Sequence, residues 1–353
     1  MAPDTPICNR SLSIHYLRAV AALMVVAYHI FSYRLVRVPA DDPRYFLWLQ
    51  FGVAIFFMIS GYVMVSSTQG RAVTPLGFLA RRVKRIAPLY WMVTLFSLLS
   101  LGGVDAGRLI ASLCFLPWID PATGRIGLPV LDVGWTLNYE MAFYVLFALS
   151  LHLPRNVAIW SVIALLALLS SLVPLAGTHG MTLFLFQPFL LDFAAGMMIA
   201  HMRIRAPRWL LPVGFLLLAT LHAGIGARLL AVTLPAGLII ASALAWDDVL
   251  QQWRWPMLLG DASYAIYLTH IFVILAIQAM GGPIFPPVLM LGGTIMTCAL
   301  VGILAHLILE RRLFRWVTAW LRRTASWNGA MPAPPQRRRS VIGSGKRATA
   351  LRQ

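Results

Sequence analysis

The sequence has little charge and too few polar residues to surround a soluble core. Asp, Glu, Lys and Arg together make up 12% of its 353 residues, whereas a soluble domain has roughly 25%. Apolar residues make up 59% of the chain, and the mean hydropathy is +0.77. This composition excludes a water-soluble globular protein.

Acidic residues and cysteines are also scarce. Twelve acidic residues stand against 29 basic ones, which gives a formal charge of +17. In a polar chain this balance would suggest a nucleic-acid partner. In a chain this apolar it indicates a lipid bilayer instead, and we expect no nucleic acid to bind. Cys8, Cys114 and Cys298 lie far apart without a C-x-x-C pair, so we expect neither a disulfide framework nor a metal site.

Long apolar runs separated by short polar breaks recur along the chain. Most approach the ~20 residues with which a helix crosses a hydrocarbon layer about 30 Å thick. Only helices and closed barrels satisfy the backbone there, and the runs lack the strict alternation of barrel strands. We therefore predict an all-α fold, a polytopic integral membrane helical bundle with about ten transmembrane helices. The runs cover residues 14–33, 46–67, 87–103, 132–151, 157–175, 182–201, 209–221, 229–246, 257–280 and 288–309.

Basic residues concentrate in alternate breaks between the runs, and the positive-inside rule identifies those breaks as cytoplasmic. This assignment places both termini in the cytoplasm and the segment 105–130 outside. We expect residues 1–320 to form the membrane-embedded domain. Residues 321–353 are rich in Arg, Pro, Ser and Gly, and they predict a disordered basic cytoplasmic tail because they cannot bury enough apolar surface to fold.

Three ionisable side chains, His29, Glu140 and His270, lie well inside the apolar runs. A charge in the hydrocarbon layer costs about 3 kcal/mol or more, so each needs a partner or a function. At a rise of about 1.5 Å per residue, the two histidines lie roughly 20 Å from the cytoplasmic side, and Glu140 lies roughly 12 Å below the outer side. All three therefore fall in the outer half of the bilayer. Arg18 precedes His29 by about three helical turns, so it lies on the same helix face, about 16 Å further in.

This arrangement suits a histidine that acts as a general base on a hydroxyl group. The Glu140 carboxylate would fix its tautomer or stabilise the imidazolium. The alternative is that the imidazoles and the carboxylate pair across helices only to hold them together. Three such groups at one depth, with Arg18 in phase with one of them, favour catalysis.

The segment 70–88 carries five basic residues and no acidic one. Positive-inside orientation alone is one explanation. The other is a phosphate-rich ligand, since the arginine fork matches phosphate oxygens. Arg82 and Arg85 would point the same way in a helix. A basic inner entrance below a histidine and a carboxylate suggests a ligand that enters from the cytoplasm and reacts further out.

Five short motifs follow one another along the chain. They are Arg18 with His29 in an Arg-x10-His pattern, residues 56–62 (FFMISGY), 82–86 (RVKRI), 134–140 (GWTLNYE) and 263–270 (SYAIYLTH). Together they resemble the motifs of acyltransferase family 3, a family of integral membrane proteins. The stretch 134–141 is most similar to the subgroup of exopolysaccharide production O-acetyltransferases.

The resemblance implies a multi-pass O-acyltransferase of the cell inner (plasma) membrane. Such an enzyme would move an acetyl or other short acyl group from cytoplasmic acetyl-CoA to a sugar hydroxyl of an exported polysaccharide or a lipid-linked glycan. The resemblance also assigns an essential histidine, three residues on the CoA side and a close helix contact. The essential histidine would be His29. Arg18, Arg82 and Arg85 would lie on the CoA side, and Ser60 with Gly61 would form the close helix contact.

Our hypothesis is that His29 takes the proton of the acceptor hydroxyl while Glu140 stabilises the resulting imidazolium. The developing oxyanion would receive a hydrogen bond from one of three residues, between which the sequence does not choose. They are Asn138, Tyr267 and His270.

Two alternatives stay open. One is a covalent relay through Ser60 or Ser263, which we rank below direct transfer because small-residue packing explains Ser60 more simply. The other is a proton-coupled transporter or flippase of a glycan or small solute, in which the embedded histidine and glutamate form a proton relay. A transporter would move the intact solute and release no free CoA.

Overall fold

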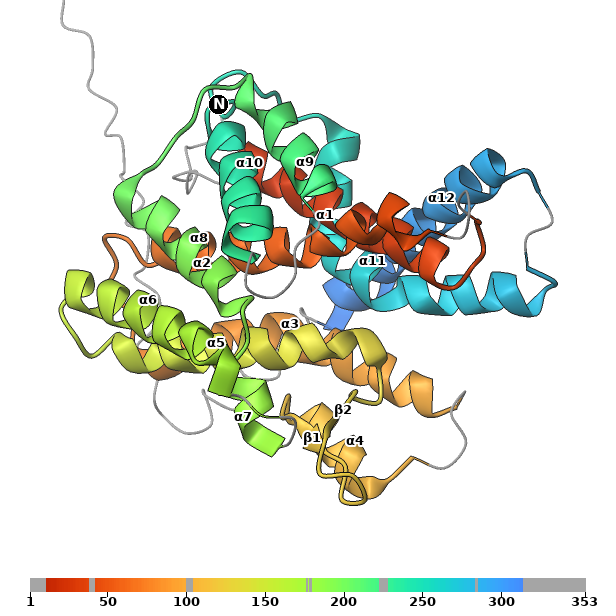
Figure 1. Ribbon diagram of the computed structural model, residues 1–353, viewed down its shortest axis with the longest axis horizontal. Coiled ribbons are helices and arrows are strands. Elements are labelled where there is room, and N and C mark those ends of the chain that lie inside the picture. The colour runs from red at the N-terminus through yellow and green to blue at the C-terminus, as the bar shows by residue number, and fades with distance from the viewer. Residues whose placement is uncertain are drawn as a thin grey trace, which may run out of the picture. The chain divides into compact units, whose positions relative to one another are not determined.

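Helices form at the apolar runs of the sequence. The computed structural model describes residues 11–37, 42–99, 104–175, 177, 180–221, 228–282 and 285–313, and Figure 1 shows how their elements are arranged. The predicted tail 321–353, and the domain boundary before it, lie outside these residues. The helices are α1 (Leu12–Ser32), α2 (Gly52–Ser67), α3 (Pro75–Leu98), α4 (Ala106–Leu113), α5 (Trp135–Ser150), α6 (Arg155–Ser171), α7 (Gly180–Leu185), α8 (Leu190–Met202), α9 (Leu210–Thr220), α10 (Leu234–Leu244), α11 (Arg254–Ala279) and α12 (Pro287–Ala305).

Shorter elements extend or interrupt these helices. Strands β1 (Trp118–Ile119) and β2 (Ile126–Gly127) form an antiparallel hairpin in which Trp118 pairs with Gly127. The remaining short elements are 3₁₀ turns at Pro43–Tyr45, Leu47–Phe51, Asp132–Gly134 and Val173–Leu175, and π-helical turns at Leu229–Thr233 and His306–Glu310.

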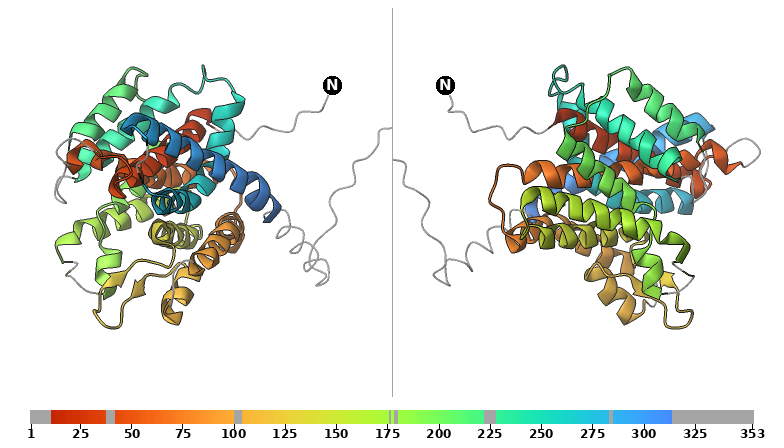
Figure 2. Two further views of the ribbon diagram at one scale, coloured as in Figure 1. Left: turned by 90° about the vertical axis from the view of Figure 1, so that its right-hand side faces the viewer. Right: turned by 60° about the vertical axis from the view of Figure 1, so that its left-hand side comes forward.

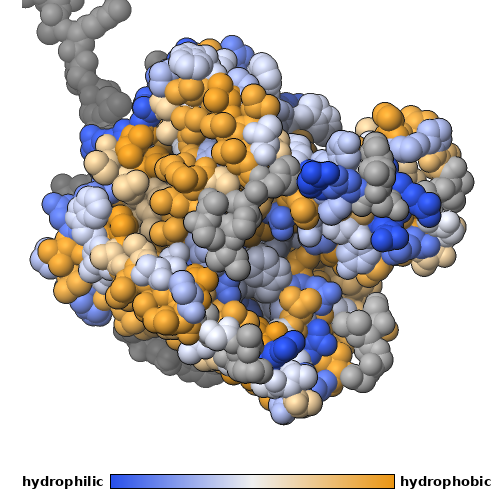
Figure 3. All heavy atoms as spheres, viewed as in Figure 1, coloured by the Kyte–Doolittle hydropathy of each residue, from blue (hydrophilic) through white to orange (hydrophobic). Residues whose placement is uncertain are grey.

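The described residues confirm the predicted helical fold, and several of the helices suit a membrane. Large apolar side chains such as Val288, Leu289 and Met296 stay exposed on α12, and Figure 3 shows apolar side chains gathered over the region of α9 and α10. The count of about ten spans and the cytoplasmic termini stay predictions. Within the described ranges, five helical segments are long and apolar enough to cross a bilayer: Leu12–Ser32, Leu47–Ser67, Gly180–Met202, Arg254–Ala279 and Pro287–Leu313.

The segment 70–88 is mostly helical, whereas the sequence indicated a cytoplasmic loop there. Helix α3 begins at Pro75, with Thr74 as its N-cap, and the Thr74 hydroxyl accepts a hydrogen bond from the Gly77 backbone N–H. A threonine cap followed by proline in the first turn is a strong helix start. Arg82 and Arg85 therefore lie three residues apart on a formed helix and share one face.

The helices that carry the predicted site residues pack around α1 and α2. Helix α1 contacts α2 and α11, α2 contacts α8, and α3 contacts α5. Figure 2 shows the arrangement of the helices from two further sides. Helices that are remote in sequence thus share one core. Its largest cluster of buried apolar side chains includes residues of α2, α3, α5, α8 and α11.

Two glycines let α2 and α8 approach closely. A Cβ atom at Gly196 would overlap the backbone oxygen of Met58, and one at Gly61 would overlap that of Phe193. Small residues at such positions allow helix backbones to meet without a hydrophobic driving force in lipid. The contact fixes the position of α2 along α8, and with it the position of Ser60, which precedes Gly61 in the sequence.

We expect Gly196→Ala to destabilise the folded protein by about 1–3 kcal/mol, because the added methyl group must push two helix backbones apart. Thermal unfolding in detergent, followed by tryptophan fluorescence, measures the change. The matched control is Gly292→Ala on α12, where an added Cβ meets nothing within 4 Å. If both variants unfold at the wild-type temperature, the close approach of α2 and α8 at Gly196 does not contribute to stability.

Candidate functional site

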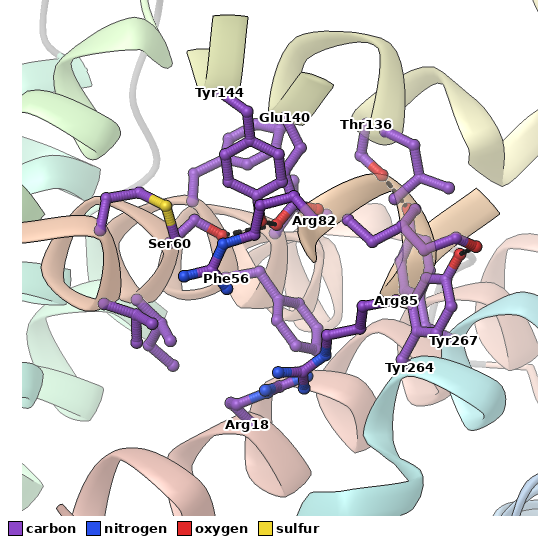
Figure 4. Close-up of a pocket in the computed structure, with 17 residues that line it drawn as sticks. Arg18, Phe56, Ser60, Arg82, Arg85, Thr136, Glu140, Tyr144, Tyr264 and Tyr267 are labelled. Carbon is purple, nitrogen blue, oxygen red and sulfur yellow. Dashed lines mark hydrogen bonds between the residues drawn. The ribbon is translucent and has the colours of Figure 1, made fainter. Parts of the chain in front are cut away.

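An inner cavity lies between α1, α2, α3, α5 and α11. Its empty volume is about 830 Å³, counted with the open space at its mouth. Three arginines line it, Arg18 from α1 and Arg82 and Arg85 from α3, and Figure 4 shows their guanidinium groups directed into the same space. Arg82 and Arg85, which the sequence pattern assigned to a phosphate-rich ligand, therefore lie in one cavity with Arg18, which the family resemblance grouped with them.

Arg82 is the arginine whose contacts are best defined. Its Nη2 donates to the Ser67 hydroxyl at 3.3 Å. Its guanidinium carbon lies 5.5 Å from the ring centre of Phe78 and 5.7 Å from that of Tyr144. Packing beside aromatic rings leaves the other N–H groups of this arginine available to a ligand.

Glu140 supplies a carboxylate to this inner cavity. One of its oxygens, Oε1, accepts hydrogen bonds from the Ser60 hydroxyl at 2.8 Å and from the Tyr144 hydroxyl. Ser60 thus has a polar partner as well as a place beside the helix contact of Gly61. Tyr144 was not among the sequence candidates, although its position one turn after Glu140 could have indicated it. With three arginines and one carboxylate, the inner cavity carries a net positive charge.

An outer cavity adjoins the inner one. Its empty volume is about 820 Å³, again with its open mouth included, and it is lined by His29 and Arg228. Val53 and Tyr267 line both cavities, so the two spaces meet at these side chains. The rest of the lining is largely aromatic: Tyr28, Phe51, Trp135, Phe189 and Tyr267.

His29 is held by a backbone carbonyl and a second histidine. Its Nδ1 lies 2.9 Å from the Val25 oxygen and 3.2 Å from Nε2 of His270. His270 is fully buried, with its own Nδ1 3.2 Å from the Ile266 oxygen. Carbonyl oxygens only accept, so Nδ1 carries the proton in both rings, and the one Nδ1–H of His29 is shared between the Val25 oxygen and Nε2 of His270. This pattern makes Nε2 of His29 its basic nitrogen.

The expected pair of His29 and Glu140 does not form in this structure. Thr136, on the same face of α5, bonds the Tyr267 hydroxyl at 2.8 Å where the cavities meet. Glu140 follows one turn later, about 6 Å further along the helix, and so it faces Ser60 and Tyr144. The partner that His29 has instead is His270.

The three oxyanion candidates occupy different places. Asn138 donates from Nδ2 to the Leu116 backbone oxygen at 3.2 Å and lines neither cavity. Tyr267 stands at the junction, with its hydroxyl 2.8 Å from the Val133 oxygen. His270 lies behind His29 and belongs to the lining of neither cavity. Of the three, only Tyr267 borders the space in which a substrate could lie.

A buried ion pair beside the outer cavity was not predicted as part of the site. Asp192 of α8 is fully buried, and it accepts hydrogen bonds from Arg228 Nη2 at 2.6 Å and from the Thr233 hydroxyl at 2.7 Å. The signal in the sequence was an aspartate inside the apolar run 182–201, with an arginine at the start of the run 229–246 available to neutralise it.

Comparisons with known proteins match most of the chain. The sequence profile of the Acyltransferase domain family matches residues 11–306, which include every site residue named above. The exopolysaccharide production protein ExoZ of Rhizobium meliloti (strain 1021) is 36% identical over 297 residues, which cover 75% of this chain and 89% of that protein. No solved structure shows significant similarity.

We expect Glu140→Ala to destabilise the protein, because the buried Tyr144 hydroxyl loses its acceptor at a penalty of about 1–3 kcal/mol. Glu140→Gln keeps an acceptor oxygen and should lose less. Thermal unfolding in detergent compares them with Asp248→Asn, whose carboxylate is 73% exposed and 3.9 Å from Arg205 and should contribute little. Equal unfolding temperatures for Glu140→Ala and Asp248→Asn would contradict the structural role of Glu140.

Proposed function

The chain belongs to the Acyltransferase domain family, and from this premise we propose that it is a membrane O-acyltransferase of exopolysaccharide production. It transfers an acetyl or other short acyl group from cytoplasmic acyl-CoA to a hydroxyl of an exported or lipid-linked polysaccharide. One observation carries the proposal: a cavity lined by arginines adjoins a cavity lined by His29, with Val53 and Tyr267 common to both.

The inner cavity suits the donor. Coenzyme A carries its charge on phosphates, and guanidinium forks bind phosphate oxygens in bidentate geometry. Arg18, Arg82 and Arg85 give the cavity a positive charge, and Glu140 is occupied with two hydroxyl groups. The phosphates bind at these arginines, and the uncharged pantetheine arm extends past Phe56 toward Tyr267.

The reaction follows from the protonation of the two histidines. Nε2 of His29 takes the proton of the acceptor hydroxyl as that oxygen attacks the thioester carbonyl carbon. The new C–O bond forms, the C–S bond breaks, and the departing CoA thiolate recovers the proton from the imidazolium. His270 orients the His29 ring throughout. It is a positioning residue, because its contact is with His29 and not with the substrate.

Direct transfer needs no covalent intermediate on the enzyme. Ser60, the candidate for a relay, donates its proton to Glu140 at 2.8 Å in the inner cavity, whereas His29 lines the outer cavity. The Glu140 carboxylate in this proposal balances the three arginines and holds Ser60 and Tyr144, which is a different role from the partner of the base.

We expect His29→Ala to lower acetyl transfer by roughly 10²- to 10⁴-fold, the usual contribution of a general base. Membrane vesicles permeabilised with mild detergent receive labelled acetyl-CoA and the cells' own extracellular polysaccharide after mild alkaline removal of its esters, and polymer-bound label is counted. The control is His152→Ala, an exposed histidine just after α5.

Full transfer by His29→Ala would refute the catalytic assignment. Wild-type vesicles that move an intact solute with protons, and release no CoA from acetyl-CoA, would favour the transporter instead.

We expect His270→Leu to lower kcat for acetyl transfer by about tenfold or more while the KM for acetyl-CoA stays unchanged, because only the orientation of His29 is lost. His270→Asn offers a side-chain oxygen to the N–H of His29 and should recover part of kcat. The same transfer assay measures both variants. If the asparagine variant is no better than the leucine variant, or if the KM for acetyl-CoA rises with the loss of kcat, His270 does not act by positioning the base.

A further inference from the structure

The outer cavity holds an arginine that the reaction described above does not use. Arg228 lines this cavity together with His29. Its side chain is 18% exposed, and its guanidinium lies about 6 Å from the ring centres of Phe51 and Phe189. Nη2 is bound to Asp192, but Nε is buried and has no hydrogen-bond partner among the described residues. A buried N–H without an acceptor is rare in native proteins, so the hydrogen-bonding capacity of this guanidinium is not fully used.

Asp192 binds this arginine on the side away from the outer cavity. Both carboxylate oxygens are engaged, one by Arg228 and the other by the Thr233 hydroxyl, and the side chain is fully buried. Asp192 itself does not line the outer cavity. The pair therefore fixes the guanidinium against the cavity wall and neutralises its charge.

The two cavities consequently differ in charge. The inner one has three arginines and a single carboxylate among its lining residues. In the outer one, Arg228 is neutralised by Asp192 at 2.6 Å, and no carboxylate belongs to the lining. A polyanion is favoured in the inner cavity by its net charge. The outer cavity has an arginine in its wall but no net charge, which suits an uncharged polyol.

The walls of the outer cavity fit such a ligand as well. Trp135 and Phe189 lie with their ring centres 5.7 Å apart, and both line the cavity. Sugar rings have apolar C–H faces that pack on aromatic rings, while their oxygens need a few well-placed polar groups for orientation. Arg228 provides such a group in the same space as the basic nitrogen of His29.

We propose that the outer cavity is the acceptor subsite, that it binds an uncharged pyranose ring against its aromatic wall, and that Arg228 donates to an oxygen of that sugar. Asp192 is a positioning residue that holds Arg228. This inference rests on the proposed acyltransferase function, and it names the class of acceptor: a neutral hexose unit whose hydroxyl reaches His29.

The first test measures acetyl transfer by Arg228→Lys and Arg228→Gln in the vesicle assay, with labelled acetyl-CoA and the de-esterified polysaccharide as probes. Both variants should raise the KM for polysaccharide by about tenfold or more, because they lose the oriented fork. The Kd for acetyl-CoA, measured on detergent-purified protein without acceptor, should stay unchanged. Arg85→Gln should give the reverse pattern, and Arg125→Gln, an exposed arginine next to β2, should change neither constant.

The outcomes separate this inference from the proposed function. If wild-type protein transfers no acetyl group at all, the proposed function fails. If wild-type protein transfers but Arg228→Lys and Arg228→Gln keep the KM for polysaccharide, only the acceptor subsite is refuted. It is refuted equally if acetyl-CoA binding weakens along with acceptor binding in both variants, since the ion pair would then support the fold and not the cavity.

The second test addresses charge. Methyl glucopyranoside should compete with the polysaccharide in the wild-type assay, and methyl glucuronide of the same ring should compete at least about tenfold less well, because no net positive charge attracts its carboxylate. Stronger competition by the glucuronide would show that Arg228 acts as an anion site and would overturn the assignment of a neutral acceptor.

Discussion

The structure depends on one constraint: an ionisable group among apolar helices needs a partner, because lipid provides none. The chain meets this constraint in three ways. Asp192 and Arg228 form a direct ion pair at 2.6 Å. Glu140 takes hydroxyl donors from neighbouring positions on α2 and α5. His29 and His270 need no counter-charge, since each neutral ring finds a backbone carbonyl for its Nδ1. These arrangements leave different net charges in the cavities beside them.

The two cavities therefore differ in net charge. Beside Glu140 the uncompensated arginines leave positive charge, and beside Asp192 the arginine is neutralised. The hydroxyl groups of Thr136 and Tyr267 bond to each other where the two spaces meet. Under the proposed function, the positive charge of the inner cavity would favour the charged donor there and leave the outer cavity to the uncharged acceptor. The side chains that set these charges come from parts of the chain as far apart in sequence as Arg18 and Arg228.

The sequence predicts the helices well because length and hydropathy alone decide whether a segment suits lipid. Where polar residues interrupt an apolar run, this measure fails: the arginines of 81–85 made the start of α3 resemble a loop, although the Thr74 cap and Pro75 indicate a helix. Residue counts give the positions of His29, Glu140 and His270 along their own helices. They do not predict which of these residues pair, because a position along one helix says nothing about which face of a neighbouring helix it meets. The contact between His29 and His270 depends on how α1 packs against α11, and that is a property of the whole bundle.

The partner that His29 has also suits its proposed work better than the carboxylate that the sequence suggested. A carboxylate at Nδ1 stabilises the charged imidazolium before reaction as well as during it, and in a site of low dielectric this attraction is strong. A ring that is already protonated cannot accept the proton of an acceptor hydroxyl. A neutral imidazole at the same position fixes the tautomer and the ring orientation without that ground-state attraction. In the proposed reaction, with Glu140 kept one turn further along α5 among the arginines, the base would stay neutral until the hydroxyl arrives, and the carboxylate would balance the charge at the donor site. Separation of these two ionisable groups is therefore consistent with a division of labour between proton transfer and donor binding.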